Sequence, residues 1–204
     1  MYEFVKRNLL KNICFLLLVL LIGACSYKTY QKSGSKPHWV SWSRGKMFKT
    51  KKKPSKNVTL DKGVTYLFVI ESTADMPTYK REDVEDLVRL KASSYYASLL
   101  KANIEEFLLN EKNISSEERE VFLHKTNTLS YSVDISGLLP VAKYWEQVKN
   151  RKIVQNKVYA LYSVTKNRME HNMKDLSNRI GFSQKLKDNL IEQQQYIEEK
   201  NYEN

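Results

Sequence analysis

The sequence predicts an α+β fold, a two-layer sandwich in which a small, mainly antiparallel sheet is packed by a long helix, with further helices at the C-terminus. A β-branched and aromatic run at 64–70 indicates a buried strand. Residues 78–111 contain no Gly or Pro and carry apolar side chains at helical spacing. Two more apolar runs, 140–148 and 157–165, precede helical patterns that reach residue 200. Strand, helices, antiparallel strands and helices, in this order, are typical of an α+β sandwich.

The first 24 residues predict an export signal. A basic start is followed by an apolar stretch at 13–22, which is shorter than the ~20 residues that a membrane-spanning helix needs. The stretch ends in Leu-Ile-Gly-Ala-Cys at 21–25, the form of a lipobox, where bacteria acylate a cysteine and cleave before it. We therefore expect a lipoprotein signal peptide at 1–24 and a lipidated Cys25. The alternative is an ordinary secretory signal with an incidental cysteine.

The cysteine count predicts a domain without disulfides. Only Cys14 and Cys25 are present, and Cys14 leaves with the signal. A domain of this kind must be held by its own apolar core, and residues 58–204 are numerous enough to form one. We expect 58–204 to be a single α+β domain with a C-terminal helical segment.

Positive charge is concentrated between the signal and this domain. The chain carries +11 overall, but residues 26–57 hold ten basic side chains and no acid, whereas residues 58–204 are close to neutral. We expect 25–57 to be the lipidated cysteine followed by a basic tether along an anionic membrane, or else a solvated linker. A nucleic-acid partner is not expected, because the folded part has no basic face.

Two tryptophans interrupt the basic segment at Pro37-His38-Trp39-Val40-Ser41-Trp42. We expect this stretch to be the first piece that docks on the domain, because tryptophans rarely lie free in solvent. Insertion into the membrane interface is the alternative. The candidate membrane or partner contacts are therefore Trp39, Trp42, Lys49, Lys51, Lys52 and Lys53.

The middle of the chain predicts a second helix and two further strands. Ser115 followed by Glu118 is a capping box, which starts a short helix. Residues 128–136 alternate apolar and polar side chains, as in a half-exposed strand. A hairpin turn is expected at Asn150 and Arg151, between the runs 140–148 and 157–165.

Two helices are expected at the C-terminus, 166–180 and 183–200. Gly181 ends the first. The second has a narrow apolar stripe that includes Leu186, Leu190 and Ile197, which suits either the edge of its own domain or a coiled-coil seam with a partner helix. We favour the first of these interpretations.

Aromatic residues are concentrated in the expected sheet and the helix against it. These tyrosines are interpreted as core packing, or alternatively as an aromatic face for a protein or glycan partner. In the run 157–165, Tyr159 and Leu161 point opposite to Ala160 and Tyr162. Because both faces are apolar, this strand is expected to be central and covered by helices on at least one face.

No pattern in the sequence indicates catalysis. His38, His124 and His171 are far apart and belong to no metal-binding motif. A hydrolase nucleophile elbow and a phosphate-binding loop are both absent, and acylation would consume the remaining thiol. We expect no enzyme activity, no catalytic residue, no metal and no cofactor.

Several short motifs together resemble a known family. They are the lipobox, the Pro-x-Trp-Val element at 37–40, the Ala-bearing helix at 90–107, Tyr-Trp-Glu at 144–146 and Val-Tyr-Ala-Leu-Tyr-Ser-Val at 158–164. In this combination the chain resembles the LPP-twenty family of small bacterial envelope lipoproteins, some of which support flagellar motility. The chain departs from the family at 69–73, where no glycine follows the first strand. The resemblance implies no catalytic residues.

These features predict a membrane-anchored cell-envelope lipoprotein with a non-enzymatic structural or partner-binding role. The expected partners are the membrane, through the lipid, and an envelope protein or a second copy of the chain. The alternative is a ligand-binding or regulatory lipoprotein of cell-wall synthesis or of the motility apparatus. Ser26 stands where an aspartate would retain the protein at the inner membrane, so we expect the outer membrane. No acidic cluster follows Cys25, so the domain is expected to face the periplasm.

Overall fold

The computed structural model describes residues 28–42, 47–50, 60, 65–76, 78–132, 138, 140–150 and 153–200. The expected signal peptide and Cys25 lie outside these ranges. In chain order the elements are β1 (Lys28–Lys32), the 3-10 helix η1 (His38–Ser41), β2 (Met47–Thr50), β3 (Thr65–Asp75), α2 (Arg81–Asn110), α3 (Ser116–Leu129), the 3-10 turn η2 (Ser130–Ser132), β4 (Pro140–Asn150), β5 (Ile153–Thr165), α4 (Lys166–Ile180) and α5 (Gln184–Lys200).

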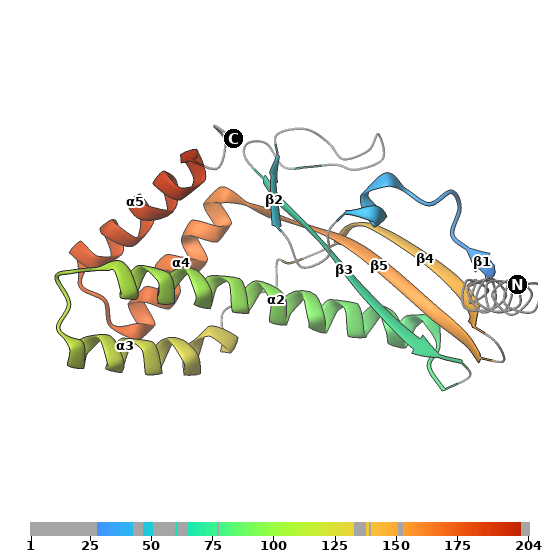
Figure 1. Ribbon diagram of the computed structural model, residues 1–204, viewed down its shortest axis with the longest axis horizontal. Coiled ribbons are helices and arrows are strands. Elements are labelled where there is room, and N and C mark those ends of the chain that lie inside the picture. Colours follow the sequence, from blue (N-terminus) through green and yellow to red (C-terminus); the bar gives the residue numbers. More distant parts are fainter. Residues whose placement is uncertain are drawn as a thin grey trace, which may run out of the picture.

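Five strands form one antiparallel sheet in the order β1-β4-β5-β3-β2 (Figure 1). The central strand β5 pairs with β4 on one side and with β3 on the other. Its register with β3 runs from Thr65 opposite Thr165 to Asp75 opposite Gln155. The predicted α+β fold is confirmed, with an antiparallel sheet packed by a long helix and with helices at the C-terminus.

The two faces of β5 belong to two different apolar clusters. Ala160 and Tyr162 join the large core under α2, on what we call the helix face of the sheet. Tyr159 and Leu161 join a smaller core with Trp39 and residues of β3 and β4, on the N-terminal face. The predicted alternation and the central position of β5 are therefore confirmed, and these tyrosines are core residues.

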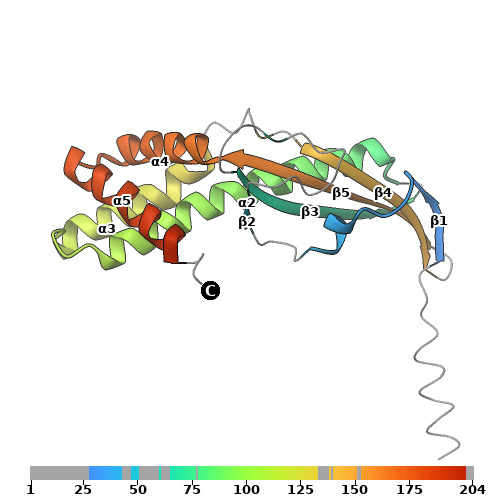
Figure 2. The ribbon, with the colours of Figure 1, turned by 90° about the horizontal axis from the view of Figure 1, so that it is seen from above.

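Helix α2 covers the helix face and continues beyond it (Figures 1 and 2). It starts where the Asp83 carboxylate accepts a hydrogen bond from the Lys80 backbone N–H at 2.8 Å. Its first buried residues are small, including Val88 and Ala92, which lets the helix approach the sheet closely. Its later ones, such as Phe107, are large. At 1.5 Å per residue, the 30-residue helix is about 45 Å long.

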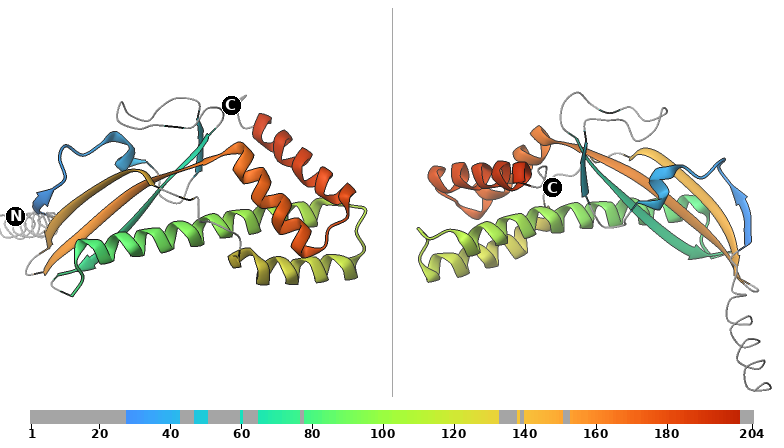
Figure 3. Two further views of the ribbon diagram at one scale, coloured as in Figure 1. Left: turned by 180° about the vertical axis from the view of Figure 1, so that it is seen from behind. Right: turned by 45° about the horizontal axis from the view of Figure 1, so that its top comes forward.

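Helices α3, α4 and α5 group around the C-terminal half of α2, and we call this region the helical end (Figure 3). The predicted capping box is present, since the Ser115 hydroxyl accepts from the Glu118 N–H and the Glu118 carboxylate accepts from the Ser115 N–H, both at 3.2 Å. Gly181 ends α4 with φ +96°, a left-handed conformation. Leu190 of α5 is buried in the main core, so α5 packs on its own domain as expected.

The predicted strand at 128–136 is wrong in its described part. Residues up to Leu129 belong to α3, and Ser130–Ser132 form η2. The helix continues because Phe122, Thr126 and Leu129 share one face, where Thr126 is buried and the other two pack against the core. The Thr126 hydroxyl also donates to the Phe122 carbonyl at 2.7 Å. Residues 133–137 lie outside the described ranges.

The expected domain boundary at residue 58 is placed too late. β1 pairs with β4 and β2 pairs with β3, so the sheet already includes residues from Lys28 onward. The N-terminal segment, residues 33–42, lies on the N-terminal face, where Trp39 and Val40 are buried (Figure 2). Much of the expected basic tether is therefore part of the domain, because its strands complete the sheet and its tryptophan covers apolar surface that α2 does not reach.

We predict that Trp39→Ala destabilises the domain strongly. The side chain is only 1% exposed, and truncation of a buried aromatic residue costs about 3–5 kcal/mol. The urea midpoint measured by circular dichroism should fall accordingly. Trp42→Ala, at a half-exposed tryptophan, is the matched control and should cost clearly less. Equal losses for both variants would contradict the role given to Trp39.

We also predict that stability falls as pH rises from 10 to 12. Burial raises the pKa of Tyr96 to about 12, although its hydrogen bond from Asn172 and the nearby Arg168 act in the opposite direction. The unfolded phenol ionises near 10, so this contribution is complete below pH 10 and is lost as pH approaches 12. The unfolding free energy measured at pH 9 and at pH 11.5 tests this sign. Tyr96→Phe should reduce the difference between the two values.

Candidate functional site

Strand β4 is held from both faces by segments that are distant in sequence. From residue 143 onward, past the register shift at 140–142, its odd-numbered residues, such as Trp145, meet the start of α2 on the helix face. Its even-numbered residues, such as Tyr144, meet the N-terminal segment on the other face. Four features meet at the far end of β4: the start of β1, the β4–β5 hairpin, the end of β3 and the turn into α2 (Figure 1). We call this region the hairpin end, and it is the candidate site.

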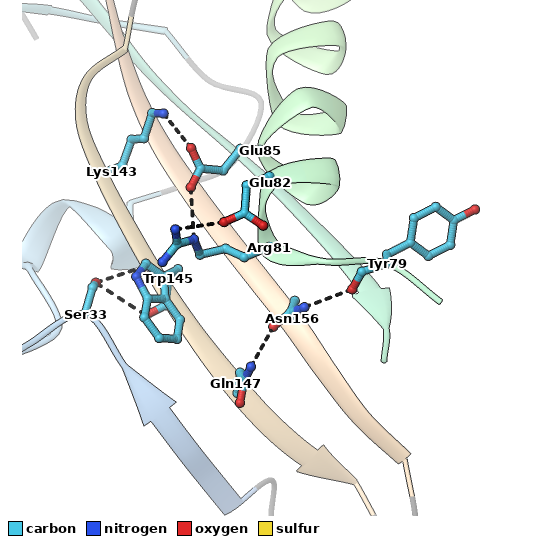
Figure 4. Close-up of polar contacts among 9 residues, drawn as sticks. All are labelled: Ser33, Tyr79, Arg81, Glu82, Glu85, Lys143, Trp145, Gln147 and Asn156. Carbon is cyan, nitrogen blue, oxygen red and sulfur yellow. Dashed lines mark hydrogen bonds and ion pairs between the residues drawn. The ribbon is translucent and has the colours of Figure 1, made fainter. Parts of the chain in front are cut away.

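On the helix face, a charged group ties α2 to β4 (Figure 4). The Arg81 guanidinium lies 5.3 Å from the centroid of the Trp145 ring. The Glu85 carboxylate accepts from Lys143 at 2.6 Å and pairs with Arg81 at 3.4 Å. These side chains are partly exposed, so each ion pair contributes less than about 1 kcal/mol. The group orients the first turn of α2 more than it stabilises the fold.

A buried amide fixes the turn between β3 and α2. The Asn156 side chain donates to the Tyr79 carbonyl at 3.0 Å and accepts from Gln147 at 3.1 Å (Figure 4). Asn156 is buried, so both of its polar groups require partners. The backbone of Tyr79 is held in this way, whereas its ring points away from the other residues drawn in Figure 4.

On the N-terminal face, the buried carboxylate of Glu146 contacts several polar side chains. Glu146 accepts from the Tyr159 hydroxyl at 3.2 Å and the Tyr144 hydroxyl at 3.4 Å, and it pairs with Lys36 at 3.5 Å. Burial raises the pKa of Tyr144, and the negative charge of Glu146 raises it further. The Lys36 and Lys157 ammonium groups each lie 5.4 Å from the centroid of the Tyr159 ring. This cluster fastens the N-terminal segment to the sheet.

Ser33 adds a second point of attachment between the N-terminal segment and the sheet. Its N–H donates to the Trp145 carbonyl at 3.0 Å, and its hydroxyl accepts from the Trp145 N–H at 3.1 Å (Figure 4). Ser33 therefore extends the β1–β4 pairing past the last residue of β1 and directs the chain toward η1. Strand β1 and the start of the N-terminal segment are therefore hydrogen-bonded to β4.

The predicted contact residues are separated by the fold. Trp39 is buried, so the membrane-insertion alternative is wrong for this residue. Trp42 is half-buried, and its indole N–H donates to His38 at 3.2 Å. Lys49 belongs to β2, opposite Tyr66. Lys51, Lys52 and Lys53 lie outside the described residues, as does Cys25.

Within the described ranges, no three side chains of the His, Cys, Asp and Glu types come together in a way that could hold a metal ion. The tyrosines of the alternative aromatic docking face that the structure describes as buried support core packing instead. Tyr144 and Tyr159 are buried on one face, and Tyr96 and Tyr162 are buried on the other. Among the helices that the structure describes, none is long and apolar enough to cross a bilayer.

A pocket of about 310 Å³ lies at the helical end, remote from the hairpin end. Its lining includes Asn113, Phe122, Lys185 and Asn189, from α3, α5 and the turn before α3. The adjacent Glu111 accepts from Asn113 and Asn189, and the backbone N–H of Asn113 is the main reason that the pKa of this carboxyl is lowered. The pocket has polar and apolar walls in similar measure.

No local pattern in the sequence indicates the groups that hold β4. Arg81 and Glu85 stand in the first turns of a helix, where charged residues usually face solvent, and nothing in the sequence pairs them with Lys143. Glu146 offered a weak signal, since an acid between Trp145 and Gln147 in an apolar strand needs partners if it is buried.

Comparisons of the chain with protein-family models, with curated proteins and with solved structures gave no match.

We predict that Glu146→Ala weakens the domain by about 1–3 kcal/mol, because two buried phenol hydroxyls lose their acceptor. Glu146→Gln, which keeps an acceptor oxygen, should cost less. Glu82→Ala is the control, since Glu82 forms only an exposed pair with Arg81 and should change stability by less than about 0.5 kcal/mol. Urea denaturation of the three variants measures the loss of unfolding free energy in each. Equal losses for Glu146→Ala and Glu82→Ala would contradict this prediction.

Proposed function

We propose that the chain is a cell-envelope lipoprotein of the outer membrane, anchored through Cys25, that faces the periplasm and has a structural or partner-binding role without catalysis. The lipobox at 21–25 carries this proposal. The structure supports it by placing the start of the sheet at Lys28, three residues after Cys25. Removal of residues 1–24 would leave the whole described domain intact.

The short connection changes how the anchor is expected to act. Three extended residues span at most about 11 Å, so a lipid on Cys25 would hold the domain at the membrane surface. The earlier expectation of a long basic tether is replaced by a folded segment. Strand β1, Ser33 and the buried Trp39 are the contacts that support this view.

The non-enzymatic role is supported by the polar groups near the hairpin end, which form hydrogen bonds and ion pairs between segments of the chain. Glu146 is engaged with Tyr144, Tyr159 and Lys36, and Glu85 with Arg81 and Lys143. These contacts hold one segment of the chain against another. The helical end, by contrast, exposes Leu109 and Val121, two large apolar side chains on neighbouring helices. We propose this end as the partner-binding region.

Membership of the LPP-twenty family is part of the proposal. The short motifs behind the resemblance lie far apart in sequence, but Trp39, Tyr144 and Tyr159 meet in the same core cluster. A shared packing arrangement of these three aromatic residues would explain why such motifs recur together. The absence of glycine at 69–73 is explained separately, because these residues lie within β3.

A second candidate function is ligand binding, which the pocket at the helical end favours. Its volume suits a small molecule, and its lining mixes amide and charged groups with Phe122 and Leu186. A stabilising ligand would raise the melting temperature, and the rise would continue with the logarithm of the free ligand concentration above Kd. A partner protein at the same end would instead be recovered by site-specific crosslinking at Val121, with Leu90 on the other half of α2 as the matched position.

We predict that Cys25→Ser prevents acylation and leaves the signal uncleaved. Cys25 is the only cysteine after the signal, so no other residue can take the lipid. Labelling cells with a fatty-acid analogue measures this directly, and Cys14→Ser is the control that should label normally. Label that persists on the Cys25→Ser protein would end the lipoprotein proposal.

A further inference from the structure

We infer that the hairpin end of the sheet lies directly against an anionic phospholipid surface, with Met76, Tyr79 and Ile153 in the interface. The inference deepens the proposed function and rests on the lipid anchor at Cys25. It assigns a membrane-facing surface to described residues that neither the lipobox nor the basic segment had suggested.

The register of the strands brings the surface together. Lys28 at the start of β1 lies opposite Lys149 near the tip of the β4–β5 hairpin. Asp75 at the end of β3 lies opposite Gln155, and the next residue, Met76, donates its N–H to the Val154 carbonyl at 2.8 Å. The first described residue of the chain, the hairpin and the β3–α2 turn therefore share one end of the molecule (Figure 1).

This end exposes apolar side chains. Met76 is 37% exposed, Tyr79 45% and Ile153 49%, and they are three of the six large hydrophobic side chains exposed in the described part of the chain. The other three are distributed along α2 and α3. Tyr79 suits an interface especially well, because its backbone is fixed by Asn156 while its amphipathic ring points outward (Figure 4).

The charge of this end fits an anionic surface. Lys149, near the tip of the hairpin, has an exposed side chain. The acidic groups nearby already have partners: Asp75 accepts from Gln155 at 2.7 Å, Asp83 from the Lys80 N–H at 2.8 Å and Glu82 from Arg81 at 2.9 Å. Lipid phosphates would attract the positive charge of Lys149.

By sequence, Arg151 and Lys152 join β4 to β5 and add two positive charges; they lie outside the described residues, and the surface is defined without them.

The position of the lipid anchor indicates that a membrane covers this surface. With Lys28 at most about 11 Å from Cys25, the acyl chains cannot enter a bilayer unless the hairpin end is close to its headgroups. Helix α2 also starts at this end and runs away from it for about 45 Å, which carries the helical end and its exposed Leu109 away from the start of the sheet (Figure 1). One anchor therefore fixes which end faces the lipid and which faces the periplasm.

The test uses single cysteines on the purified, lipid-anchored protein. Cys14 is removed and Cys25 acylated, so Met76→Cys or Ile153→Cys supplies the only thiol for an environment-sensitive fluorophore. Leu90→Cys and Leu109→Cys are matched controls on exposed apolar positions of α2. The proteins are reconstituted in vesicles of phosphatidylethanolamine with a minority of phosphatidylglycerol, with and without brominated lipid.

At positions 76 and 153 we expect blue-shifted emission and quenching of about twofold or more by brominated lipid, with neither effect at 90 and 109. Equal signals at all four positions in vesicle-bound protein would overturn the inference. It would also be overturned by a blue shift at 153 that appears without vesicles and grows with protein concentration, because a second copy would then cover the surface.

Lys149→Glu combined with Ile153→Cys tests whether positive charge contributes to binding at the hairpin end. The substitution reverses the charge of an exposed side chain, which repels anionic lipid. An unchanged urea midpoint shows that weaker quenching does not come from loss of the fold. We expect quenching at 153 to fall, whereas Lys112→Glu at the helical end leaves it unchanged. No effect of Lys149→Glu would reject the anionic surface.

Flotation and the reactivity of Cys25 show separately whether the lipid anchor is present. If the protein does not float with vesicles and Cys25 reacts as a free thiol, then the proposed function is rejected together with this inference. If the protein floats and Cys25 is blocked but position 153 stays in water, only the inference is rejected.

Discussion

The central strand β5 is apolar on both faces, and the remaining elements are arranged to cover it. Ala160 and Tyr162 require a cover on one face, while Tyr159 and Leu161 require one on the other. The long helix α2 supplies the first cover. Because one helix cannot reach both faces, the second cover comes from the N-terminal segment, and Trp39 is the side chain that completes it. The basic segment is folded for this reason, although its composition resembles that of a linker.

Covering the second face also positions the start of the chain. To place Trp39 over the sheet, the preceding residues run along β4 as β1, and Ser33 continues their pairing. The direction of β1 then puts Lys28 at the hairpin end, beside Lys149. A requirement of core packing thus decides which end of the molecule is joined to the residues before Lys28. The lipid anchor and the fold would share one structural element.

Periodicity predicted the long helix, the capping box at Ser115, the helix end at Gly181 and the alternation in β5, because each depends on neighbouring residues. It could not predict β1 or β2, whose short sequences lie in a lysine-rich segment and form strands because β4 and β3 offer open edges. β3 also runs to Asp75, past its expected end at residue 70, since these residues pair with the start of β5. The Glu146 and Arg81 contacts join residues far apart in sequence and leave no local pattern.

The distribution of residue size along α2 gives the molecule its two ends. Small side chains such as Val88 and Ala92 seat the first half on the sheet, whereas Leu100 and Phe107 fill the space among α3, α4 and α5. Sheet and helical end therefore share one continuous core through a single helix, so the two ends are mechanically linked. If the proposed anchor is correct, a partner at the helical end would bind at the opposite end of this shared core from the membrane. Because α2 separates them by most of its length of about 45 Å, the hairpin end and the helical end are separable targets for mutation.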